Sequence, residues 1–380
     1  MKEVLQHISE KFIPFWRNMY DARGGFFGAH ANGILEKEAS RGSIMHLKML
    51  WFFSRSYQAF KDPNLKSMAD HAYRYIVEKM IDPMYGGFYY ALRADGYPLD
   101  LTKHANVSAL GLYAFTAYFD ITKDYSVLKN AFECFNTIEV RCRRELAYHE
   151  QFDGKFLPVK NSKMCETINA TKNVKTLLHI LEAYTDFYYA TKNDTVKDAL
   201  EYVYGLLKYR VFDEMTGSFD VFMDNDLDTE YDVVDAGINM HGSWALTNAA
   251  VALGSFVRED VAVVKKLVDK SIIDCFDGEA MGYRKYSKKQ DTDRLSWVQA
   301  ESIVGLLNVY SLTKQEGYLD KAKTIWHFSK NNLAVNGGWY WGKTKAGKLL
   351  DKPLCNGERG PYHEGRMFLE ILRRGINLGL

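Results

Sequence analysis

Eight residues of this 380-residue chain combine side-chain types that could do chemistry together. They are Lys48, His104, His179, His241, Trp244, Trp297, Glu301 and His363. Imidazoles can transfer protons near neutral pH or bind a metal ion. Indole rings offer flat apolar faces on which a sugar can stack, although burial in a core explains any single ring equally well. If the fold gathers these side chains, they form a polar cavity with aromatic walls.

Helical spacing supports such a gathering. On the segment 169–191, positions i, i+4 and i+7 place on one face Lys175, His179 and Glu182. On the segment 234–254, one face carries His241, Trp244 and Asn248. The flanking residues are largely apolar, so the alternative is that each histidine is a hydrogen-bonded core residue. For His104, which opens its helix, the alternative is a surface or capping role.

Other classes of site and partner are disfavoured. No His-Glu-x-x-His or comparable motif occurs, so we predict no metal site. The net charge is +1 and no basic run interleaves with aromatics, which argues against nucleic acid as a partner. Glu3 and Glu10 interrupt the stretch where a secretory signal would be apolar, and no later stretch is long and uncharged enough to span a bilayer. We expect a cytoplasmic protein, monomeric or weakly dimeric.

Twelve segments have the apolar periodicity of helices and would position these residues. Their approximate ranges are 2–20, 40–60, 64–81, 103–121, 124–140, 169–191, 194–210, 234–254, 258–273, 294–313, 316–333 and 360–377. Odd-numbered segments are amphipathic, whereas even-numbered ones are more apolar, as in helices packed on two sides. This alternation predicts an all-α fold, an (α/α)6 barrel, in which six inner helices stand inside six outer helices and residues 1–380 form a single domain.

A glycine–aromatic motif joins each outer helix to its inner partner, as in "YGGFYYALRADGYP" at 85–98. The aromatic recurs at Phe26, Phe88, Phe156, Phe219, Tyr283 and Trp339. The separations of 62, 68, 63, 64 and 56 residues indicate a repeated unit. Inner helices pass to the next outer helix through a few residues, such as "TKD" at 122–124. All long loops should therefore lie at one end of the ring, where the inner helices begin, and there we expect the site.

Four strings resemble segments of the N-acylglucosamine 2-epimerase family, and most of all its cellobiose 2-epimerase branch. They are "MHLKMLWFFSRSY", "LLHILEAYTDFY", "WVQAESIVGLLNVY" and "PYHEGRMFLEILRRG". The similarity runs from "FIPFW" at 12–16 through the final helix. Members of that family have the α/α toroid fold and epimerise or isomerise unmodified sugars without metal. The resemblance thus implies a small-molecule sugar as partner and no cofactor.

The resemblance also implies roles for individual residues. In the family, one imidazole takes a proton from the carbon next to the sugar carbonyl, a second returns one, and a third helps to hold and open the ring. His363 matches one of the proton-transfer histidines, and His179 matches the supporting one. The positions that line the family's sugar subsite correspond here to Trp244, Trp297 and Glu301.

Other positions depart from the family pattern. The second proton-transfer histidine is replaced by Ile238, and a family glutamate is replaced by His241, one helical turn further on. The arginine that binds the sugar carbonyl oxygen is Lys48, which keeps the charge but loses the planar two-point grip. The remaining replacements put Asn106 in place of a tyrosine, Lys175 in place of an asparagine, and Glu358 in place of a tryptophan. The two lysines hint at an acidic or phosphorylated sugar.

These features predict a carbohydrate 2-epimerase or aldose–ketose isomerase that works through an enediolate. His363 would be the principal base, His241 or His179 the second acid/base, and Lys48 the electrophile. Losing the histidine at 238 harms epimerisation more than isomerisation, because inversion needs proton access to both faces. One alternative is a catalytically silent sugar-binding member of the family. Another is a glycoside hydrolase or lyase on the same toroid; hydrolysis would need a second carboxylate beside Glu301.

Overall fold

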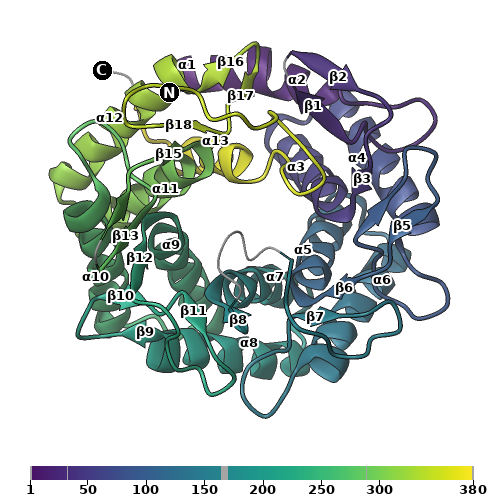
Figure 1. The fold of residues 1–380 in the computed structure, drawn as a ribbon, viewed down its shortest axis with the longest axis horizontal. Coiled ribbons are helices and arrows are strands. Elements are labelled where there is room, and N and C mark those ends of the chain that lie inside the picture. The colour runs from purple at the N-terminus through teal and green to yellow at the C-terminus, as the bar shows by residue number, and fades with distance from the viewer. Residues whose placement is uncertain (1, 32, 164–169, 288, 379–380) are drawn as a thin grey trace.

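Six helices of a computed structural model form an inner ring, among the described residues 2–31, 33–163, 170–287 and 289–378. They are α3 Ser43–Phe60, α5 Ala105–Thr122, α7 Val174–Thr191, α9 Ala236–Leu253, α11 Ser296–Thr313 and α13 His363–Arg374. Each packs on the next, and α13 closes the ring against α3. Figure 1 looks down the axis of this ring. The predicted (α/α)6 barrel is confirmed.

The outer layer consists of helices that contain a π-helical segment in four of the six hairpins and end in one in three of them. These elements are α1 Lys2–His7 with η1 Ile8–Phe12 and α2 Ile13–Arg17, α4 Pro63–Tyr75 with η2 Ile76–Met80, α6 Tyr125–Asn136 with η3 Thr137–Cys142, α8 Asp194–Leu206 with η4 Leu207–Val211, α10 Arg258–Cys275, and α12 Glu316–Asn332. The predicted helix 2–20 is therefore divided into three helical pieces and ends at Arg17. Residue 169, the predicted start of the sixth helix, lies outside the described residues, and α7 begins at Val174.

The short turns from inner to outer helices follow from local chemistry. The helix α3 ends at Phe60. The next residue, Lys61, has a φ of 57°, in the left-handed region that terminates helices. Asp62 follows at once and caps α4 by accepting a hydrogen bond from the backbone N–H of Asn64 at 2.9 Å. Lys123 and Asp124 repeat this arrangement between α5 and α6. One residue stops a helix and the next starts its partner, so the hairpins are tight.

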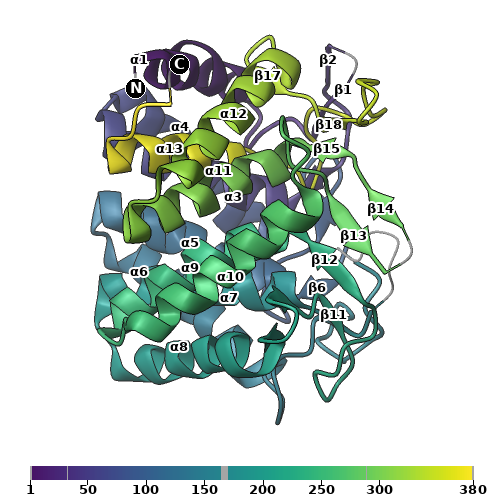
Figure 2. The same cartoon turned by 90° about the vertical axis from the view of Figure 1, so that its left-hand side faces the viewer.

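The opposite end of the ring carries short antiparallel strands, which the sequence did not predict. They are β1 Ala29–Ala31, β2 Ile34–Glu36, β3 Arg41–Gly42, β4 Ala91–Leu92, β5 Pro98–Asp100, β6 Lys103–His104, β7 Gln151–Phe152, β8 Lys172–Asn173, β9 Phe212–Asp213, β10 Ser218–Phe219, β11 Phe222–Met223, β12 Val233–Asp235, β13 Arg284–Tyr286, β14 Gln290–Asp291, β15 Arg294–Leu295, β16 Ala334–Val335, β17 Gly338–Trp339 and β18 Gly342–Lys343. Figure 2 shows many of them gathered along one side of the molecule. The long loops therefore share one end, as predicted.

Several of these strands hold the starts of inner helices. The strands β3, β6, β8, β12 and β15 run directly into α3, α5, α7, α9 and α11. Each pairs with a strand from the loop that follows; β15, for instance, pairs with β18 so that Leu295 faces Gly342. The first turns of the inner helices are consequently fixed from outside the ring. No helix among the described residues is long and apolar enough to cross a membrane.

Candidate active site

A cavity of about 150 Å³ opens among the first turns of the inner helices. Its walls come from α3, α7, α9, α11, α13 and the loop before α13. The lining residues are Lys48, Lys175, His179, Ile238, His241, Ser296, Trp297, Trp341, Glu358, Arg359, Gly360, His363 and Glu364. Seven of the ten predicted site residues, from separate parts of the chain, are thus brought to one space.

His363 is held on the cavity wall by a buried carboxylate. Its Nδ1 lies 2.6 Å from Oε1 of Glu301, and because a carboxylate only accepts, Nδ1 carries the proton. The other oxygen of Glu301 accepts from Nε1 of Trp244 at 2.8 Å. Burial lowers the pKa of His363 to about 4, although the bond to Glu301 acts in the opposite direction. The imidazole is therefore neutral at pH 7, with the lone pair on Nε2.

Two more histidines share a second buried carboxylate, Glu182. Nδ1 of His179 lies 2.9 Å from Oε2 of Glu182, and Nε2 of His241 lies 3.2 Å from the same oxygen. The hydroxyl of Tyr362 also donates to it, at 2.5 Å. Burial lowers the pKa of His179 to about 3, so this ring is neutral as well. His179 points its Nδ1 at the carboxylate, whereas His241 uses Nε2.

Arg366 connects the two carboxylates behind the cavity wall. Its Nη2 lies 2.7 Å from Oε1 of Glu182, and its Nη1 lies 3.6 Å from Oε1 of Glu301. Burial would raise the pKa of Glu182, but Arg366 and the adjacent histidines hold it well below its usual value. For Glu301, burial is likewise outweighed by His241, His363 and Arg366, so the pKa falls to about 2. Both carboxylates are ionised and orient the histidines.

The sequence did not indicate a role for Arg366, Tyr362 or Arg359. It placed Glu182 on a helical face but indicated no role for it either. A signal for Arg366 was present, since it follows His363 by three residues and so lies on the same side of the final helix. Nothing local could pair it with Glu182, which is 184 positions earlier in the chain (366 − 182).

The side chain of Lys48 contacts the backbone of Glu358. Nζ of Lys48 donates to the carbonyl oxygen of Glu358 at 2.8 Å, while the Glu358 carboxylate accepts from the hydroxyl of Tyr90 at 2.6 Å. Burial lowers the pKa of Lys48 to about 8. Lys175 lies on the same cavity, with Nζ 5.7 Å from the centroid of the Trp297 ring. The side chain of Glu358 is thus directed to Tyr90, while Lys48 and Lys175 line the cavity.

The two tryptophans occupy different settings. Trp297 lines the cavity and rests on Gly237, where a Cβ would lie only 2.3 Å from the indole. Trp244 is buried behind the wall, stacked under His241 at 5.1 Å and with the Arg366 guanidinium 4.4 Å from its ring centroid. Trp297 therefore has the exposed position that stacking requires, whereas Trp244 and Glu301 support the histidines from behind.

Asn106, in the first turn of α5, and His104, which precedes that helix, are not among the residues that line the cavity. Nδ1 of His104 accepts from the backbone N–H of Asn106 at 3.1 Å, so His104 is a helix cap, though a buried one. The Asn106 side chain is fully buried, and neither its oxygen nor its nitrogen has a hydrogen-bond partner in the described part of the chain.

His179, Glu182 and His241 also have the donor types of a metal site, with ligand atoms within 4.8 Å of one another. Oε1 of Glu182 is ion-paired with Arg366, and Oε2 accepts from Tyr362 and from Nδ1 of His179. A guanidinium at that distance would repel a second cation. The contacts within the protein thus account for this cluster as a hydrogen-bonded unit.

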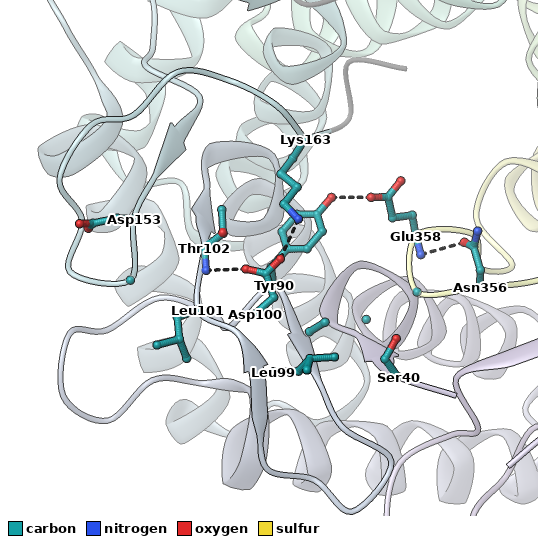
Figure 3. A pocket seen from close by; sticks show the side chains of 14 residues that line it. Ser40, Tyr90, Leu99, Asp100, Leu101, Thr102, Asp153, Lys163, Asn356 and Glu358 are labelled. Carbon is teal, nitrogen blue, oxygen red and sulfur yellow. Dashed lines mark hydrogen bonds and ion pairs between the residues drawn. The ribbon is translucent and has the colours of Figure 1, made fainter. Parts of the chain in front are cut away.

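A larger groove of about 740 Å³ adjoins the cavity, and Glu358 lines both spaces. Figure 3 shows this groove, with the Tyr90–Glu358 bond crossing toward the loop of Asn356. Beside Tyr90, Lys163 and Asp100 form an ion pair at 2.7 Å. The exposed side chains of Leu99 and Leu101 add apolar surface. The groove thus borders the cavity at Glu358.

The fold and the site define a family, and comparison with known proteins identifies it. The family model described as N-acylglucosamine 2-epimerase (GlcNAc 2-epimerase) matches residues 24–365, and the chain belongs to this family. It is 31% identical to a cellobiose 2-epimerase of Ruminococcus albus over the full length of both chains. The crystal structure of a sugar epimerase from a ruminal bacterium superimposes with a TM-score of 0.96 at 31% identity, covering 99% of each chain. A D-mannose isomerase of Marinomonas mediterranea is 22% identical, over 97% of this chain and 95% of that one.

Proposed function

We propose that this protein is a sugar epimerase or isomerase that moves a proton at the carbon next to the sugar carbonyl. The observation that carries the proposal is His363, a neutral imidazole fixed by Glu301 at 2.6 Å on the wall of a cavity that also holds Trp297. Family membership and the names of the relatives, cellobiose 2-epimerase and D-mannose isomerase, support the same class of reaction. The substrate would be a sugar in its open-chain form.

His363 would act as the base. Its Nδ1–H is bonded to Glu301, which leaves the Nε2 lone pair for the substrate proton. When Nε2 takes the proton, the ring becomes a cation beside the ionised Glu301, and the attraction between them stabilises the charge formed in the transition state. The proton, initially on carbon 2, ends on the imidazole, and its electron pair passes into the enediolate.

His179 is better placed than His241 to be a second acid/base. Both rings lean on Glu182, but His179 contacts it through Nδ1 and so leaves Nε2, the atom farthest from its backbone, for the substrate. His241 contacts Glu182 through Nε2 and is stacked on Trp244, so its remaining nitrogen is the one nearest its own helix. His241 would then orient Glu182 and Trp244 rather than touch the sugar.

Lys48 would stabilise the enediolate oxygen. Its ammonium is buried beside the cavity, and the desolvated charge interacts more strongly with a developing oxyanion than it would in water. Lysine offers a point charge rather than the fork of an arginine, so one oxygen would be held instead of two. Trp297, supported by Gly237, would provide the stacking face.

Ile238 bears on which reaction predominates. It lines the cavity as an apolar residue, and no proton can be delivered from there. Isomerisation needs one base that moves a proton between neighbouring carbons on one face, whereas epimerisation needs delivery from the other face as well. Among the described histidines of the cavity, His179 is the one best placed to supply the second face. The hydrolase alternative is less well supported, because Glu301 is committed to His363 and Trp244.

The test is proton exchange with solvent. Purified protein is incubated in deuterated water with a panel of neutral and acidic mono- and disaccharides, and the products are read by NMR. Deuterium should enter at carbon 2 in an epimerase or at carbon 1 in an isomerase, and His363→Ala should abolish it. His327→Ala, on the exposed face of α12, is the matched control and should leave the rate unchanged.

If saccharides bind but no exchange occurs anywhere in the panel, the protein is a catalytically silent sugar-binding member of the family. The replacements at the site positions, above all Ile238, are the reason for considering this alternative. Exchange that persists in His363→Ala would remove His363 from the mechanism. Release of new reducing ends from an oligosaccharide would favour a hydrolase.

A further inference from the structure

Arg366 lies among aromatic rings behind the histidines. Its side chain is only 3% exposed. The guanidinium carbon lies 4.1 Å from the ring centroid of Tyr362, 4.4 Å from that of Trp244 and 5.3 Å from that of Trp51. These rings keep water away from the cation, so its charge acts more strongly on neighbouring groups than a charge in water would.

The two oxygens of Glu182 have different surroundings. Oε2 accepts from Nδ1 of His179 at 2.9 Å and from the hydroxyl of Tyr362 at 2.5 Å. Oε1 is buried and has no hydrogen bond within the described part of the chain, and Nη2 of Arg366 lies 2.7 Å from it as an ion pair. The charge of Arg366 is thus what stabilises this oxygen.

Glu301 depends on Arg366 less than Glu182 does. Each of its oxygens has a donor of its own, Nδ1 of His363 at 2.6 Å and Nε1 of Trp244 at 2.8 Å, whereas Nη1 of Arg366 lies 3.6 Å away. Without Arg366, two buried carboxylates would share the site, and like charges in such a site favour the uptake of a proton by one of them. Glu182 would take it, because Glu182 has the oxygen that lacks a donor.

The other titratable groups around this ion pair do not replace Arg366. They are His179 with Lys48 beside it, His241, Tyr113, Tyr362 and Glu301, and one turn further along α7 Asp186, which pairs with Arg55 at 2.6 Å. The two tyrosines stay uncharged, because burial raises the pKa of each hydroxyl. Burial alone would also raise the pKa of Glu182, and among the neighbouring charges Arg366 does most to hold it below its usual value.

We propose that Arg366 is a positioning residue that keeps Glu182 ionised, and that this charge allows His179 to hold a proton for the second face of the sugar. To return a proton to carbon 2, Nε2 of His179 must first take one from solvent, which makes the ring a cation. Its Nδ1–H then bonds to an ionised carboxylate rather than to a neutral carboxyl group, and such a bond is about twice as strong.

The inference rests on the proposed function in one respect, that His179 is the second acid/base. His363 would not need Arg366, because Glu301 keeps its two donors without it. Loss of Arg366 should therefore impair epimerisation, which uses both faces, and spare isomerisation, which uses one.

The first experiment reads the ionisation of Glu182 without any need for activity. Arg366→Met removes the charge but keeps an unbranched side chain that packs well among aromatic rings. ¹³C NMR of the glutamate carboxyl carbons across the neutral pH range should show Glu182 ionised throughout in the wild type and titrating in the variant. The titrating signal is assigned by its loss when Glu182→Gln is added. A Glu182 that stays ionised in Arg366→Met would overturn the proposal.

Two further variants serve as controls for charge. Arg366→Lys keeps the cation, although it loses the planar fork, and should keep Glu182 ionised. Arg373→Met removes a cation from an exposed position of the same helix, where Arg373 pairs with Glu370 at 2.7 Å, and should change nothing. Titration of Glu182 in the Arg373→Met variant would show that no specific ion pair is involved and would count against Arg366.

The product ratio gives a second readout, which a merely structural role would not move. In Arg366→Met at neutral pH, formation of the 2-epimer should fall at least about tenfold relative to formation of the ketose. Glu182 is protonated below its raised pKa and ionised above it, so epimer formation should recover as the pH rises. Equal loss of both products at every pH would show that Arg366 only supports the fold.

Glu182→Gln answers the same question if Arg366→Met does not fold. Glutamine keeps the shape of the side chain and carries no charge at any pH. Epimer formation should therefore fall at least about tenfold, with no recovery as the pH rises. An unchanged product ratio in Glu182→Gln would overturn the proposal, and so would a wild-type protein that forms ketose alone.

The two proposals fail in different ways. If Glu182 titrates in Arg366→Met but the wild type exchanges deuterium into no sugar, the effect of Arg366 on Glu182 stands and the proposed proton transfer is refuted. If the wild type exchanges deuterium and Glu182 stays ionised in the variant, the proton transfer stands and the role of Arg366 is refuted.

Discussion

Glu301→Gln should reverse the tautomer of His363, and the surrounding contacts determine how. The two oxygens of Glu301 face different partners, Trp244 Nε1 at 2.8 Å and His363 Nδ1 at 2.6 Å. Indole N–H can only donate. In the variant, the amide oxygen must therefore face Trp244, and the amide NH2 must face His363. Arg366 opposes this orientation weakly, since its Nη1 lies at 3.6 Å.

With an NH2 group opposite, Nδ1 of His363 has to accept, so the ring proton moves to Nε2. Nε2 then has no lone pair for the substrate, and the ring can no longer act as the base. Misplacing a general base costs about 10²- to 10⁴-fold in rate, which corresponds to about 2.7 to 5.5 kcal/mol of transition-state stabilisation. Fold stability should change by only about 1.5–3 kcal/mol, the value of a hydrogen bond to a charged group.

The assay combines three measurements on one variant. The deuterium exchange rate reports catalysis, ¹⁵N NMR of the imidazole reports which nitrogen carries the proton, and urea unfolding reports stability. Glu150→Gln is the control, because Glu150 is also a buried carboxylate, bonded to Asn161 and to the backbone of Asn173, and lies off the cavity lining. An exchange rate in Glu301→Gln within about threefold of the wild-type rate would refute the reasoning.

Three further perturbations follow from the geometry. Nδ1 of His46 donates to the carbonyl oxygen of Gly42, and Nε2 accepts from the backbone N–H of Phe26. Burial lowers the pKa of His46 to about 3. Its contribution to stability is therefore complete above the pKa of the unfolded state, near 6.5, and is lost as the pH falls. Urea unfolding should lose about 1.5–2 kcal/mol between pH 6.5 and 5 from this residue, and an identical pH dependence in His46→Leu would contradict that. Gly237→Ala places a methyl group 2.3 Å from Trp297 and should raise KM about tenfold by displacing the stacking face. The control Gly205→Ala in α8, with open space around its Cα, should stabilise the fold by about 1 kcal/mol. Equal KM values for Gly237→Ala and the wild type would show that the indole does not bind sugar. Ile238→His should raise the ratio of 2-epimer to ketose by supplying the second face, and an unchanged product ratio measured by NMR would argue that position 238 cannot reach the substrate.

The helices were predictable because their signal is local, and the strands were not. Inner helix 40–60 was placed within three residues of its start at Ser43 by the apolar pattern alone. The difference arises because Arg41–Gly42 form β3, whose partner β4 lies about fifty residues further on. A strand of two residues is too short to show an alternating pattern. Such pairing depends on the finished ring.

The same distinction applies to the candidate site. The shared face of Lys175, His179 and Glu182 could be inferred from spacing, and two of the three line the cavity. That Trp244 is covered could not be inferred, because the Arg366 guanidinium over its ring comes from the last helix, 122 positions later (366 − 244). Spacing along one helix identifies a face, but only packing between helices decides what covers it.

The ionised carboxylates of the site lie behind the cavity wall, and this placement bears on the proposed proton transfer. Behind the wall, Glu182 and Glu301 with Arg366 between them leave one net negative charge next to the histidines. In front of them, His179 and His363 line the cavity itself. An imidazole that takes a proton from the substrate becomes a cation in front of this negative charge, which would stabilise the protonated ring. The carboxylates would not take the proton themselves, because Arg366 and the histidines hold the pKa values of Glu182 and Glu301 below their usual values.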